Sequence, residues 1–281
     1  IRAYATNDDG TVYSNEITII ATDGPGGDGT EGNPYQIASL ADLFWMSHSQ
    51  TEWGNTYWIQ TADIDASETS TWNGGKGFSP VGNFDFWFYG SYNGNHYNIS
   101  GLTIDKSTKD HVGLFGYTMD GTIEKLDLEN VSITGKNYVA GLVGYANPDV
   151  VMDSCTVHGT ITGEDYVGGF CGRNRGEISN SSLNVTVNGV DKVGGFVGEN
   201  FTSFASIKNS FSVGSVTGNY QVGGFVGTVS NTDCIIENCY SRANVTGNIL
   251  CGGFAGENYY GEIYSSYSTG SVAGNSSIGG F

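Results

Sequence analysis

The chain has 281 residues, and 44 of them are glycine, about 16% against an ordinary value of roughly 7%. Glycine costs about 1 kcal/mol at each helix-interior position, which argues against a helical bundle. Glycine does not recur at every third position, which excludes collagen, and an aromatic content of 13% excludes a disordered Gly/Ser linker. No run of about 18 apolar residues predicts a membrane-spanning helix. A glycine-rich, aromatic-rich β protein remains.

The charge excludes one class of partner. The chain carries 11 basic and 29 acidic residues, for a formal net charge of −18. Nucleic-acid binding requires clustered lysine and arginine to displace counterions from the phosphate backbone. We therefore expect no nucleic-acid partner, and the negative charge favours solubility.

Both ends of the sequence suggest a segment of a longer protein. The chain begins Ile1-Arg2-Ala3-Tyr4, without an initiator methionine or a signal-peptide pattern, and it ends at Phe281 inside a repeated motif. Near the N-terminus, residues 2–5 and 16–20 are predicted as two strands around a turn at 7–10. A lone hairpin is marginally stable in water, so we expect its sheet partners upstream.

The stretch that follows the predicted hairpin is rich in glycine and aspartate. Residues 23–29 read DGPGGDG and are interpreted as part of a linker spanning 23–32. The aspartates raise the question of calcium binding, but no carboxylate spacing typical of a calcium loop completes the pattern. We predict a linker here, and no cofactor or metal site anywhere in the chain.

One helix is predicted, beginning after Ser39. Ser39 is its N-cap, Asp42 lies in its first turn, and its apolar face is formed by the following residues: Leu40, Leu43, Phe44 and Met46. A short amphipathic helix suits a cap that covers the exposed end of a repeat array. All five tryptophans (Trp45, Trp53, Trp58, Trp72 and Trp87) fall in this region. They either pack beneath the cap, which we favour, or present rings to sugars.

One motif recurs seven times after residue 110. In its regular form it reads Val-Gly-Gly-Phe-Val-Gly, as at residues 193–198 and 222–227. The Leu or Phe of the motif lies at positions 114, 142, 170, 196, 225, 254 and 281, which are separated by 26 to 29 residues. Self-similarity at this period is the signature of a repeat architecture.

Each repeat also contains blocks that alternate apolar and small polar residues, as at 207–218 and 236–247, which indicates strands. We expect two or three short strands in each period. Such a unit cannot bury a core alone, but stacked copies can, with each strand pairing to its equivalent one turn later. The period is too short for a propeller blade and lacks the leucine pattern of leucine-rich repeats. The predicted fold is all-β: a right-handed parallel β-helix with turns of about 28 residues and a short N-terminal capping helix.

The repeat length varies at one place only. The distance from Asn180, Asn209 or Asn238 to the next motif phenylalanine is always 16 residues, whereas the preceding distance is 10 or 13. Variable corners stack along one edge of a solenoid, and such edges often bind ligands. The candidate ligand-facing residues of this edge are Tyr117, Tyr145, Arg173, Arg175, Phe201, Phe204, Tyr259 and Tyr260. The alternative is a set of ordinary surface loops.

The three asparagines of this spacing, Asn180, Asn209 and Asn238, are predicted to form a structural ladder of side-chain amides. Asp153 and Ser265 are expected to extend the same column. We assign the column to structure rather than to chemistry.

These motifs resemble a known family. Val-Gly-Gly-Phe-Val-Gly, combined with Ile-x-Asn-Cys/Ser-Tyr/Phe-Ser and Val-Thr-Gly, resembles the GLUG repeat of bacterial surface proteins, and residues 33–37, 62–65 and 92–96 look like the capping region that precedes such repeats. Residues 2–17 are similar to the last hairpin of a fibronectin type III-like module. The resemblance implies a large secreted or surface-anchored bacterial protein, a class that includes adhesins and some immunoglobulin A peptidases.

The resemblance and the repeats divide the chain into four parts. Residues 1–22 are the C-terminal hairpin of a truncated fibronectin III/Ig-like module, and 23–32 are the linker. Residues 33–110 form the cap and the first irregular turns, and 111–281 form GLUG-type repeats that are truncated at the C-terminus. In the first two repeats, Val112 and Ala140 replace the first motif glycine, so these turns are expected to be less regular.

The sequence contains no recognisable catalytic constellation. None of the four histidines belongs to a His-Glu-x-x-His motif. The five cysteines (Cys155, Cys171, Cys234, Cys239 and Cys251) stand where other repeats have Ser, Val or Ala, so we expect free buried thiols. In the columns that we align, no pair of acidic residues recurs on adjacent turns, as a polysaccharide lyase or hydrolase would need.

Two functions follow. The first is a non-catalytic extracellular surface module, either a structural stalk or an adhesin-type binding region, with a glycan or a protein of a host or of the environment as its partner. The alternative is a carbohydrate-active β-helix that binds or cleaves polysaccharide, or the non-catalytic part of a secreted peptidase. The fold makes a sharp prediction: the rings of Phe170, Phe196, Phe225 and Phe254 must stack in one interior column.

Overall fold

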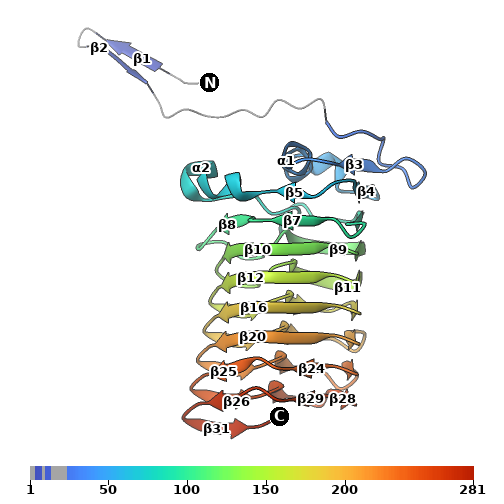
Figure 1. Cartoon of the computed structure of the whole chain (residues 1–281), viewed down its shortest axis with the longest axis vertical. Coiled ribbons are helices and arrows are strands. Elements are labelled where there is room, and N and C mark those ends of the chain that lie inside the picture. Colours follow the sequence, from blue (N-terminus) through green and yellow to red (C-terminus); the bar gives the residue numbers. More distant parts are fainter. Residues whose placement is uncertain (1–3, 8–9, 14–23) are drawn as a thin grey trace.

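Parallel strands stack one above another along the long axis of the molecule, with the helical elements gathered at the N-terminal end of the stack (Figure 1). The computed structural model describes residues 4–7, 10–13 and 24–281. Residues 111–281 repeat the same path turn after turn, and each strand pairs with its equivalent in the next turn. The predicted parallel β-solenoid is therefore confirmed.

The N-terminal hairpin differs from its prediction. β1 (Tyr4–Asn7) pairs antiparallel with β2 (Gly10–Tyr13), and Asn7 stands opposite Gly10. The first strand therefore reaches two residues beyond the predicted range 2–5, and residues 2–3 lie outside the described residues. Its partner strand is formed by residues 10–13, which were not predicted as a strand. The other predicted strand, at 16–20, lies outside the described residues.

The cap is built around α1 (Leu40–His48), as predicted. Ser39 is its N-cap: the Ser39 hydroxyl accepts a hydrogen bond from the Asp42 N–H at 3.3 Å and donates one to the Asp42 carboxylate at 2.7 Å. Leu43 and Met46 are fully buried, whereas Leu40 is partly buried and packs against the core. Trp53 and Trp58 are also buried, so packing accounts for these two tryptophans.

Three short helical segments were not predicted: η1 (Gln50–Glu52), η2 (Ser67–Thr71) and α2 (Trp72–Gly75). They lack an apolar period, so hydrophobic spacing does not reveal them. In η2, hydroxyl groups satisfy the local carbonyls instead: Thr69 Oγ1 donates to Ala66 O at 2.6 Å, and Ser70 Oγ donates to Ser67 O at 2.8 Å.

The described part of the predicted linker hydrogen-bonds to the cap. The N–H of Gln36 donates to the Gly26 carbonyl at 2.7 Å, and the N–H of Tyr57 donates to the Gly29 carbonyl at 2.9 Å. Thr30 donates two hydrogen bonds to the Asp28 carboxylate, from Oγ1 at 2.7 Å and from the backbone N–H at 3.1 Å, and these bonds hold the pKa of Asp28 below its usual value. Residues 26–30 are therefore an ordered part of the cap surface.

The regular turns contain four strands, or five where the last strand is divided in two, rather than the two or three that we predicted. One full turn consists of β17 (Asp191–Gly194), β18 (Val197–Asn200), β19 (Ser206–Lys208) and β20 (Phe211–Thr217). Gly195 and Phe196 bend the chain between β17 and β18, so a stretch that reads as one strand becomes two. The variable corner lies between β18 and β19, as the spacing predicted.

The four strands of each turn form four stacks. The first contains β13 (Asp165–Gly168), β17, β21 (Tyr220–Gly223), β26 (Ile249–Gly252) and β31 (Ser276–Gly279). The second contains β14 (Cys171–Asn174), β18, β22 (Val226–Val229) and β27 (Ala255–Asn258). The third contains β15 (Glu177–Ser179), β19, β23 (Ile235–Glu237) and β28 (Glu262–Tyr264). Toward the cap, β9 (Phe115–Glu124) and β11 (Val143–Asp153) bend across the second and third stacks, and β6 (Ser91–Asn93), β4 (Tyr57–Gln60) and β3 (Tyr35–Ile37) follow.

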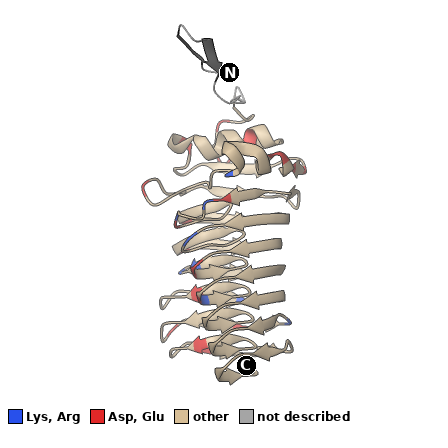
Figure 2. Cartoon of the chain, turned by 90° about the vertical axis from the view of Figure 1, so that its left-hand side faces the viewer, with Lys and Arg blue, Asp and Glu red and all other residues tan. Residues whose placement is uncertain are grey.

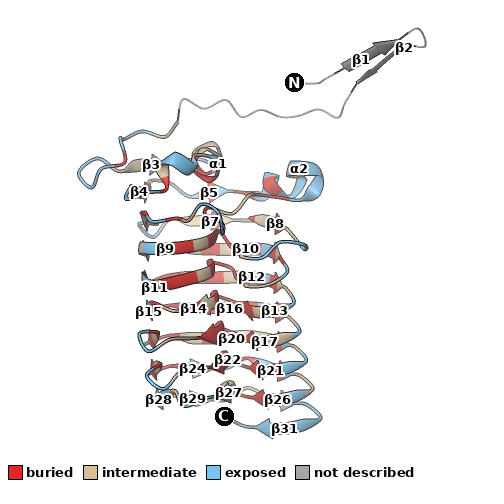
Figure 3. Cartoon of the chain, turned by 180° about the vertical axis from the view of Figure 1, so that it is seen from behind, coloured by how far each residue is buried: buried red, intermediate tan, exposed pale blue. Residues whose placement is uncertain are grey.

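The fourth stack runs from the cap to the last turn. It contains β5 (Ile64–Asp65), β7 (Asn98–Ser100), β8 (Thr103–Asp105), β10 (Asp127–Thr134), β12 (Thr156–Thr162), β16 (Ser182–Asn188), β20, β24 (Tyr240–Ser241), β25 (Asn244–Thr246), β29 (Tyr267–Ser268) and β30 (Val272–Ala273). Figure 3 shows buried residues along the strands and exposed residues at the corners and in the last turn.

The motif phenylalanines form the predicted interior column. Neighbouring rings of Phe170, Phe196, Phe225 and Phe254 stack face to face with centroids 4.7–4.8 Å apart, and all four side chains are fully buried. The motif glycine beside them permits this spacing. A Cβ placed on Gly195 would lie 2.1 Å from the carbonyl oxygen of Gly224, so no larger residue fits between the turns.

The five cysteines are free and buried. Cys155 and Cys239 occupy a column shared with Ser181 and Ser210, and all four make the same bond. The Ser181 hydroxyl donates to the carbonyl two residues before it at 2.7 Å, and the Cys239 thiol does so at 3.2 Å. Serine and cysteine are interchangeable here because both are small and can donate a hydrogen bond to this carbonyl.

Candidate functional site

The structure brings together five of the eight predicted edge residues. Tyr117, Tyr145 and Arg173 are in register on β9, β11 and β14, and Arg175 and Phe201 follow at the beginning of the variable corner. We call this part of the molecule the aromatic corner. The other three residues lie apart from it: the side chain of Phe204 is 71% exposed, and Tyr259 and Tyr260 contact each other edge-on several turns away.

The first column of the aromatic corner consists of stacked tyrosines. The rings of Tyr117 and Tyr145 are nearly parallel, 8° apart, with centroids separated by 4.7 Å. The guanidinium of Arg173 occupies the next position and lies 5.8 Å from the Tyr145 ring centroid. A cation over an aromatic face is attracted by the ring quadrupole. The column therefore ends in a favourable cation–π contact.

A second column, which sequence analysis missed, runs beside the first. The rings of His111, Tyr138 and Tyr166 stack with centroid separations of 4.9 and 4.6 Å, and the ammonium of Lys192 lies 4.6 Å from the Tyr166 centroid. Each of these residues immediately precedes the motif valine and has a positive φ, between 52° and 59°. Their shared place directly before this valine is the signal that the sequence offers. Val112 pairs with Val139, so it holds the valine position and not, as predicted, that of the first motif glycine.

The two columns pack against each other. The ring of Tyr138 meets that of Tyr145 at 74° with centroids 5.5 Å apart, and His111 meets Tyr117 at 66° and 5.2 Å. Edge-to-face contacts of this kind stabilise by about 0.5–1.5 kcal/mol beyond the area they bury. Because both columns project from consecutive strands of the same turn, the bend at the motif glycines turns their outer faces toward each other.

Both columns end at one buried carboxylate. The side chain of Glu199 on β18 is only 2% exposed; its Oε1 accepts hydrogen bonds from Lys192 Nζ and Ser230 Oγ, both at 2.8 Å. Arg173 Nε lies 2.7 Å from Glu199 Oε2, but its N–H is not aligned with that oxygen, so this contact acts as an ion pair. One negative charge thus compensates two cations.

The environment shifts the pKa of several groups in this corner. Burial is the largest influence on Lys192 and opposes its charge, but the hydrogen bond and the charge of Glu199 outweigh it and raise the pKa of Lys192. Burial lowers the pKa of His111, although Asp110 opposes this effect, and burial raises the pKa of Tyr138. The inner ring edges are therefore in a partly dehydrated environment.

Arg175 and Phe201 cover the outer side of this cluster. The guanidinium of Arg173 lies 4.1 Å from the Phe201 ring centroid. Arg175 Nη1 donates hydrogen bonds to the Tyr145 hydroxyl at 3.4 Å and to Asn147 Oδ1 at 3.2 Å. Both arginines thus lie beside the Phe201 ring, and Figure 2 shows the charged residues of the stack mainly along one of its edges.

The columns extend toward the cap through the loop that follows Ser79. The Phe84 ring is stacked near His111 at 5.9 Å, and the Trp87 ring near Tyr117 at 6.2 Å. These separations are wider than those inside the columns. The aromatic corner is therefore loosest, and its ring faces most open, at the cap end.

The predicted asparagine residues lie at a different corner, between the third and fourth stacks. Asn209 Nδ2 donates to Asn180 Oδ1 at 3.3 Å, and Asn238 Nδ2 donates to Asn209 Oδ1 at 3.4 Å. The column continues through Ser154 rather than Asp153, because Asp153 is in register with Ser179. The Asp153 carboxylate nevertheless accepts a hydrogen bond from Asn180 Nδ2 at 2.7 Å.

With the register taken from the structure, three pairs of acidic residues stand opposite each other. Asp153 is opposite Glu124, Asp149 is opposite Asp120, and Asp165 is opposite Asp191, each on adjacent turns. The expectation that no acidic pair stands on adjacent turns is therefore wrong. The prediction placed Asp153 in the asparagine column, one residue out of register, and left Asp191 out of the column of Asp165.

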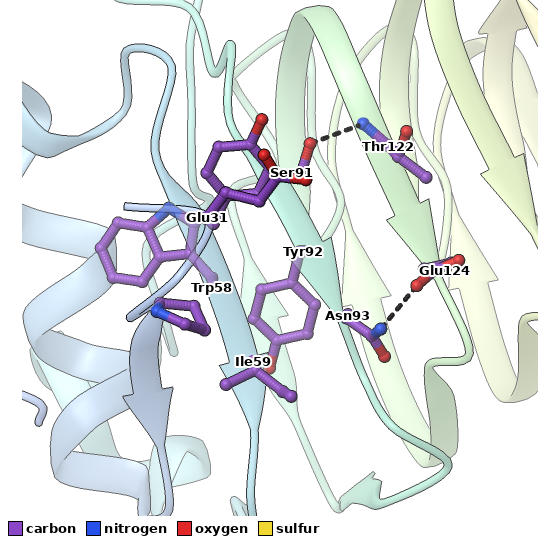
Figure 4. Close-up of a pocket in the computed structure, with 10 residues that line it drawn as sticks. Glu31, Trp58, Ile59, Ser91, Tyr92, Asn93, Thr122 and Glu124 are labelled. Atoms are coloured by element: carbon purple, nitrogen blue, oxygen red, sulfur yellow. Dashed lines mark hydrogen bonds between the residues drawn. The ribbon is translucent and has the colours of Figure 1, made fainter. Parts of the chain in front are cut away.

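A separate cavity of about 380 Å³ lies where the cap meets the third stack (Figure 4). Trp58 and Tyr92 form its base, and Glu31 and Glu124 are among its lining residues. Glu124 accepts a hydrogen bond from Asn93 and forms an ion pair with Lys125 at 3.1 Å. Its charge is thus already compensated by neighbours within the protein.

Two further searches concern metals and membranes. Among the described residues, no group of three or more His, Cys, Asp or Glu side chains is arranged to hold a metal ion. In the same part of the chain, no helix has the length and apolar character needed to cross a bilayer.

Comparison with known sequences finds the GLUG motif at residues 163–188 and 218–246. Halomucin of Haloquadratum walsbyi is 43% identical over 139 residues, which cover 47% of this chain and 2% of halomucin. A protein of Evansella cellulosilytica described as a Gly-rich membrane protein is 35% identical over 110 residues, 39% of this chain and 12% of that protein. The chain therefore spans a small part of these relatives.

Two solved structures share the fold. One, described as an immunoglobulin A1 protease of Bacteroides ovatus, superposes with a TM-score of 0.71 over 90% of this chain and 86% of that chain, at 18% identity. Another, an IgA1 protease, gives a TM-score of 0.59 at 19% identity and covers 96% of this chain but 21% of that chain. The chain thus carries GLUG motifs at residues 163–188 and 218–246 within a parallel β-solenoid fold.

Proposed function

We propose that this chain is a rigid, non-catalytic spacer module of an extracellular surface protein. The observation that carries the proposal is the interior phenylalanine column, which continues in register from turn to turn with rings 4.7–4.9 Å apart. Each turn is fixed to the next by the same backbone and side-chain contacts, so the stack resists bending. A spacer needs this continuity and needs no reactive site.

The relatives support an extracellular setting. Halomucin is named as a mucin, and the second relative is described as a membrane protein. This chain covers only 2% and 12% of their lengths, which is consistent with one module among many in a large protein. The two protease-named structures support only the shared fold, since their identity to this chain is below 20%.

Rigidity is tested by measuring a distance across the module. Cysteines introduced at the exposed Glu68 and Glu262 carry spin labels, while the five native thiols stay buried. A narrow distance distribution between the labels is expected from double electron–electron resonance. The same pair in a Phe196→Ala, Phe225→Ala background is the comparison and should broaden. A broad distribution in the unaltered background would overturn the spacer proposal.

The non-catalytic part of the proposal has its own test. Purified protein incubated with a panel of acidic and neutral polysaccharides should release no reducing sugar. Sustained release that is lost on substitution of one of the paired carboxylates, for example Asp165→Asn, would contradict the proposal and favour the carbohydrate-cleaving alternative. The position of Asp165 opposite Asp191 makes this the sharpest variant for that assay.

A second function, adhesin-type binding of a glycan or a protein, is favoured by the aromatic corner. Its ring edges and hydroxyls are half exposed along one line of the molecule, although the ring faces inside the columns are covered by stacking. A glycan array with the unaltered chain and with Arg175→Ala tests this role. Array signals that require Arg175 support binding at the corner, and signals unchanged by the substitution exclude it.

A further inference from the structure

A cleft lies at the cap end of the aromatic corner, between the loop that carries Phe84 and the loop that carries Lys109. Its volume is about 860 Å³, within the range of about 300–1,000 Å³ that is usual for ligand sites. Phe84, Phe86, Lys106 and Lys109 line it, together with Asn83 and His111. The lining thus combines aromatic rings with positive charge.

The two phenylalanine rings are exposed, although they lie on a well-ordered turn. Phe84 is 66% and Phe86 is 54% exposed. Asn83 holds the turn: its N–H donates to the Phe86 carbonyl at 2.7 Å, and its Oδ1 accepts from the N–H groups of Asp85 and Phe86, both at 3.0 Å. Trp87 Nε1 donates to the Phe84 carbonyl at 2.8 Å. Exposed rings that are held in place in this way lose little conformational entropy when a ligand covers them.

The lysines of the cleft have no carboxylate partner among residues 24–281, a property that they share with Lys136 and Lys208 but not with the three other lysines. Lys76, Lys125 and Lys192 each form an ion pair at 2.8–3.1 Å. In contrast, no carboxylate of residues 24–281 lies within 4.0 Å of the ammonium of Lys106 or Lys109. This is notable in a chain with only 11 basic residues and a net charge of −18. Burial is the largest influence on Lys106 and lowers its pKa, although the charge of Asp105 opposes this effect.

Two acidic residues, Asp85 and Asp110, also line the cleft. Neither is close enough to the lysines to form an ion pair. Their presence disfavours a ligand with dense charge, such as a polyphosphate, and favours one whose negative groups are spaced apart. Asn83 adds a donor, since its Nδ2 bonds to no atom of the described residues.

We propose that this cleft binds an acidic polysaccharide whose sugar rings carry carboxylates. The apolar face of a pyranose fits an exposed phenylalanine ring, the carboxylate pairs with Lys106 or Lys109, and the hydroxyls accept from the Asn83 amide. An acidic peptide fits less well, because extended peptides bind by adding a strand to a free sheet edge. The neighbouring β9 is already paired on both sides near the cleft, with β11 on one side and with Val81 and Phe88 of the loop on the other.

This inference goes beyond the spacer role and does not depend on it. Isothermal titration calorimetry with tetragalacturonate, a tetrasaccharide of uronic acids, is the test. We expect saturable binding, at least tenfold weaker binding to Lys106→Ala, Lys109→Ala and to Phe84→Ala, Phe86→Ala, and weaker binding at high salt. Matched controls are Lys208→Ala and Tyr267→Ala, which alter an exposed lysine and an exposed ring elsewhere and should leave the affinity unchanged.

Three outcomes would overturn the inference: no binding at millimolar tetragalacturonate, equal binding of the neutral cellotetraose, or binding of a tetraglutamate peptide in preference to the sugar. Circular dichroism and the spin-label distance show whether each variant keeps its fold. If the sugar does not bind while the spin-label distance distribution stays narrow, the cleft proposal fails and the spacer proposal stands. If the distribution is broad in the unaltered background, only the spacer proposal fails.

Discussion

Lys192 and Glu199 lie on consecutive strands of one turn, and the ammonium of Lys192 is 2.8 Å from Oε1 of Glu199. The same carboxylate neutralises Arg173 from the turn before. Each cation in turn lies over a tyrosine ring that ends an aromatic column. A single buried charge therefore fixes the C-terminal end of both columns.

Substituting Glu199 should be costly for stability. In Glu199→Gln the shape is kept, but two half-buried cations lose their counter-charge, and removing one partner of a buried pair costs about 3–5 kcal/mol. Since Arg173 and Lys192 keep some solvent contact, we expect a loss of about 2–3 kcal/mol in the free energy of unfolding, measured by urea denaturation. Glu177→Gln, at an exposed position, is the control and should change stability by less than about 0.5 kcal/mol. Equal effects of the two substitutions would show that the cluster contributes nothing specific.

Asn209 permits the backbone and side-chain contributions of its corner to be separated. Its φ is 50°, in the left-handed region, and its amide bonds to the asparagines above and below. Asn209→Ala should destabilise by about 1–2 kcal/mol, because alanine resists this φ. Asn209→Gly keeps the conformation and loses only the exposed amide bonds, so its effect should be smaller. If urea denaturation shows the glycine variant to be the less stable of the two, the strain of alanine at this φ is smaller than the entropy cost of glycine, and the strain argument is wrong.

The paired aspartates predict a pH dependence. Burial is the main cause that raises the pKa of Asp191, and the charge of Asp165 adds to it, although the hydrogen bond from Lys192 N–H opposes both. A carboxyl with a raised folded-state pKa favours folding when it is protonated, so its contribution is complete below about pH 3.8 and is lost as the pH rises through the folded-state pKa. Asp191→Asn should therefore raise the melting temperature at pH 7, and the gain should shrink toward pH 3.5.

The control for this experiment is Asp233→Asn, which removes the same charge from an exposed loop. Thermal melts followed by circular dichroism between pH 3.5 and 7.5 give the comparison. A gain for Asp191→Asn that is constant over this range, or that matches the gain of the control, would mean that general charge repulsion rather than the pair is responsible.

The cysteines should be unreactive in the folded protein. Burial raises the pKa of Cys155 and of Cys239 to about 12 and that of Cys234 to about 11, so almost no thiolate is present at pH 8. We expect Ellman's reagent to detect no thiol in the native chain and five per chain in 6 M guanidinium chloride. Prompt labelling of the native chain would place at least one thiol at the surface.

Much of the fold could be predicted because each repeat places the same residue types in the same contacts. A column such as Phe196 and Phe225 shows its periodicity directly, and Ser39 with Asp42 is a local capping pattern that needs no tertiary information. The number of strands per turn could not be predicted, because the bend at Gly195 depends on close approach to the next turn. The alternation of apolar and polar residues along the sequence does not reveal how closely one turn approaches the next.

Half of the aromatic corner was missed for a related reason. Tyr138 and Tyr145 are seven residues apart, and only the bend between their strands brings their rings together. The misplacement of Asp153 has a chemical origin: aspartate resembles the asparagine of the ladder more than Ser154 does, yet Ser154 is the residue with the left-handed φ of 56°. Similar chemistry was a poorer guide to register than backbone conformation.

The Gly-Gly-Phe bend also has an evolutionary consequence. Because Phe196 and Phe225 offer identical contacts to the turns beside them, unequal crossing-over that removes or duplicates residues 197–225 would join Phe to Val in the same way as before. The molecule can therefore gain or lose length in steps of one strand spacing, about 4.8 Å, without a new core having to arise. Each duplicated copy also brings its own variable corner, on which new surface chemistry can diverge while the interior stays the same.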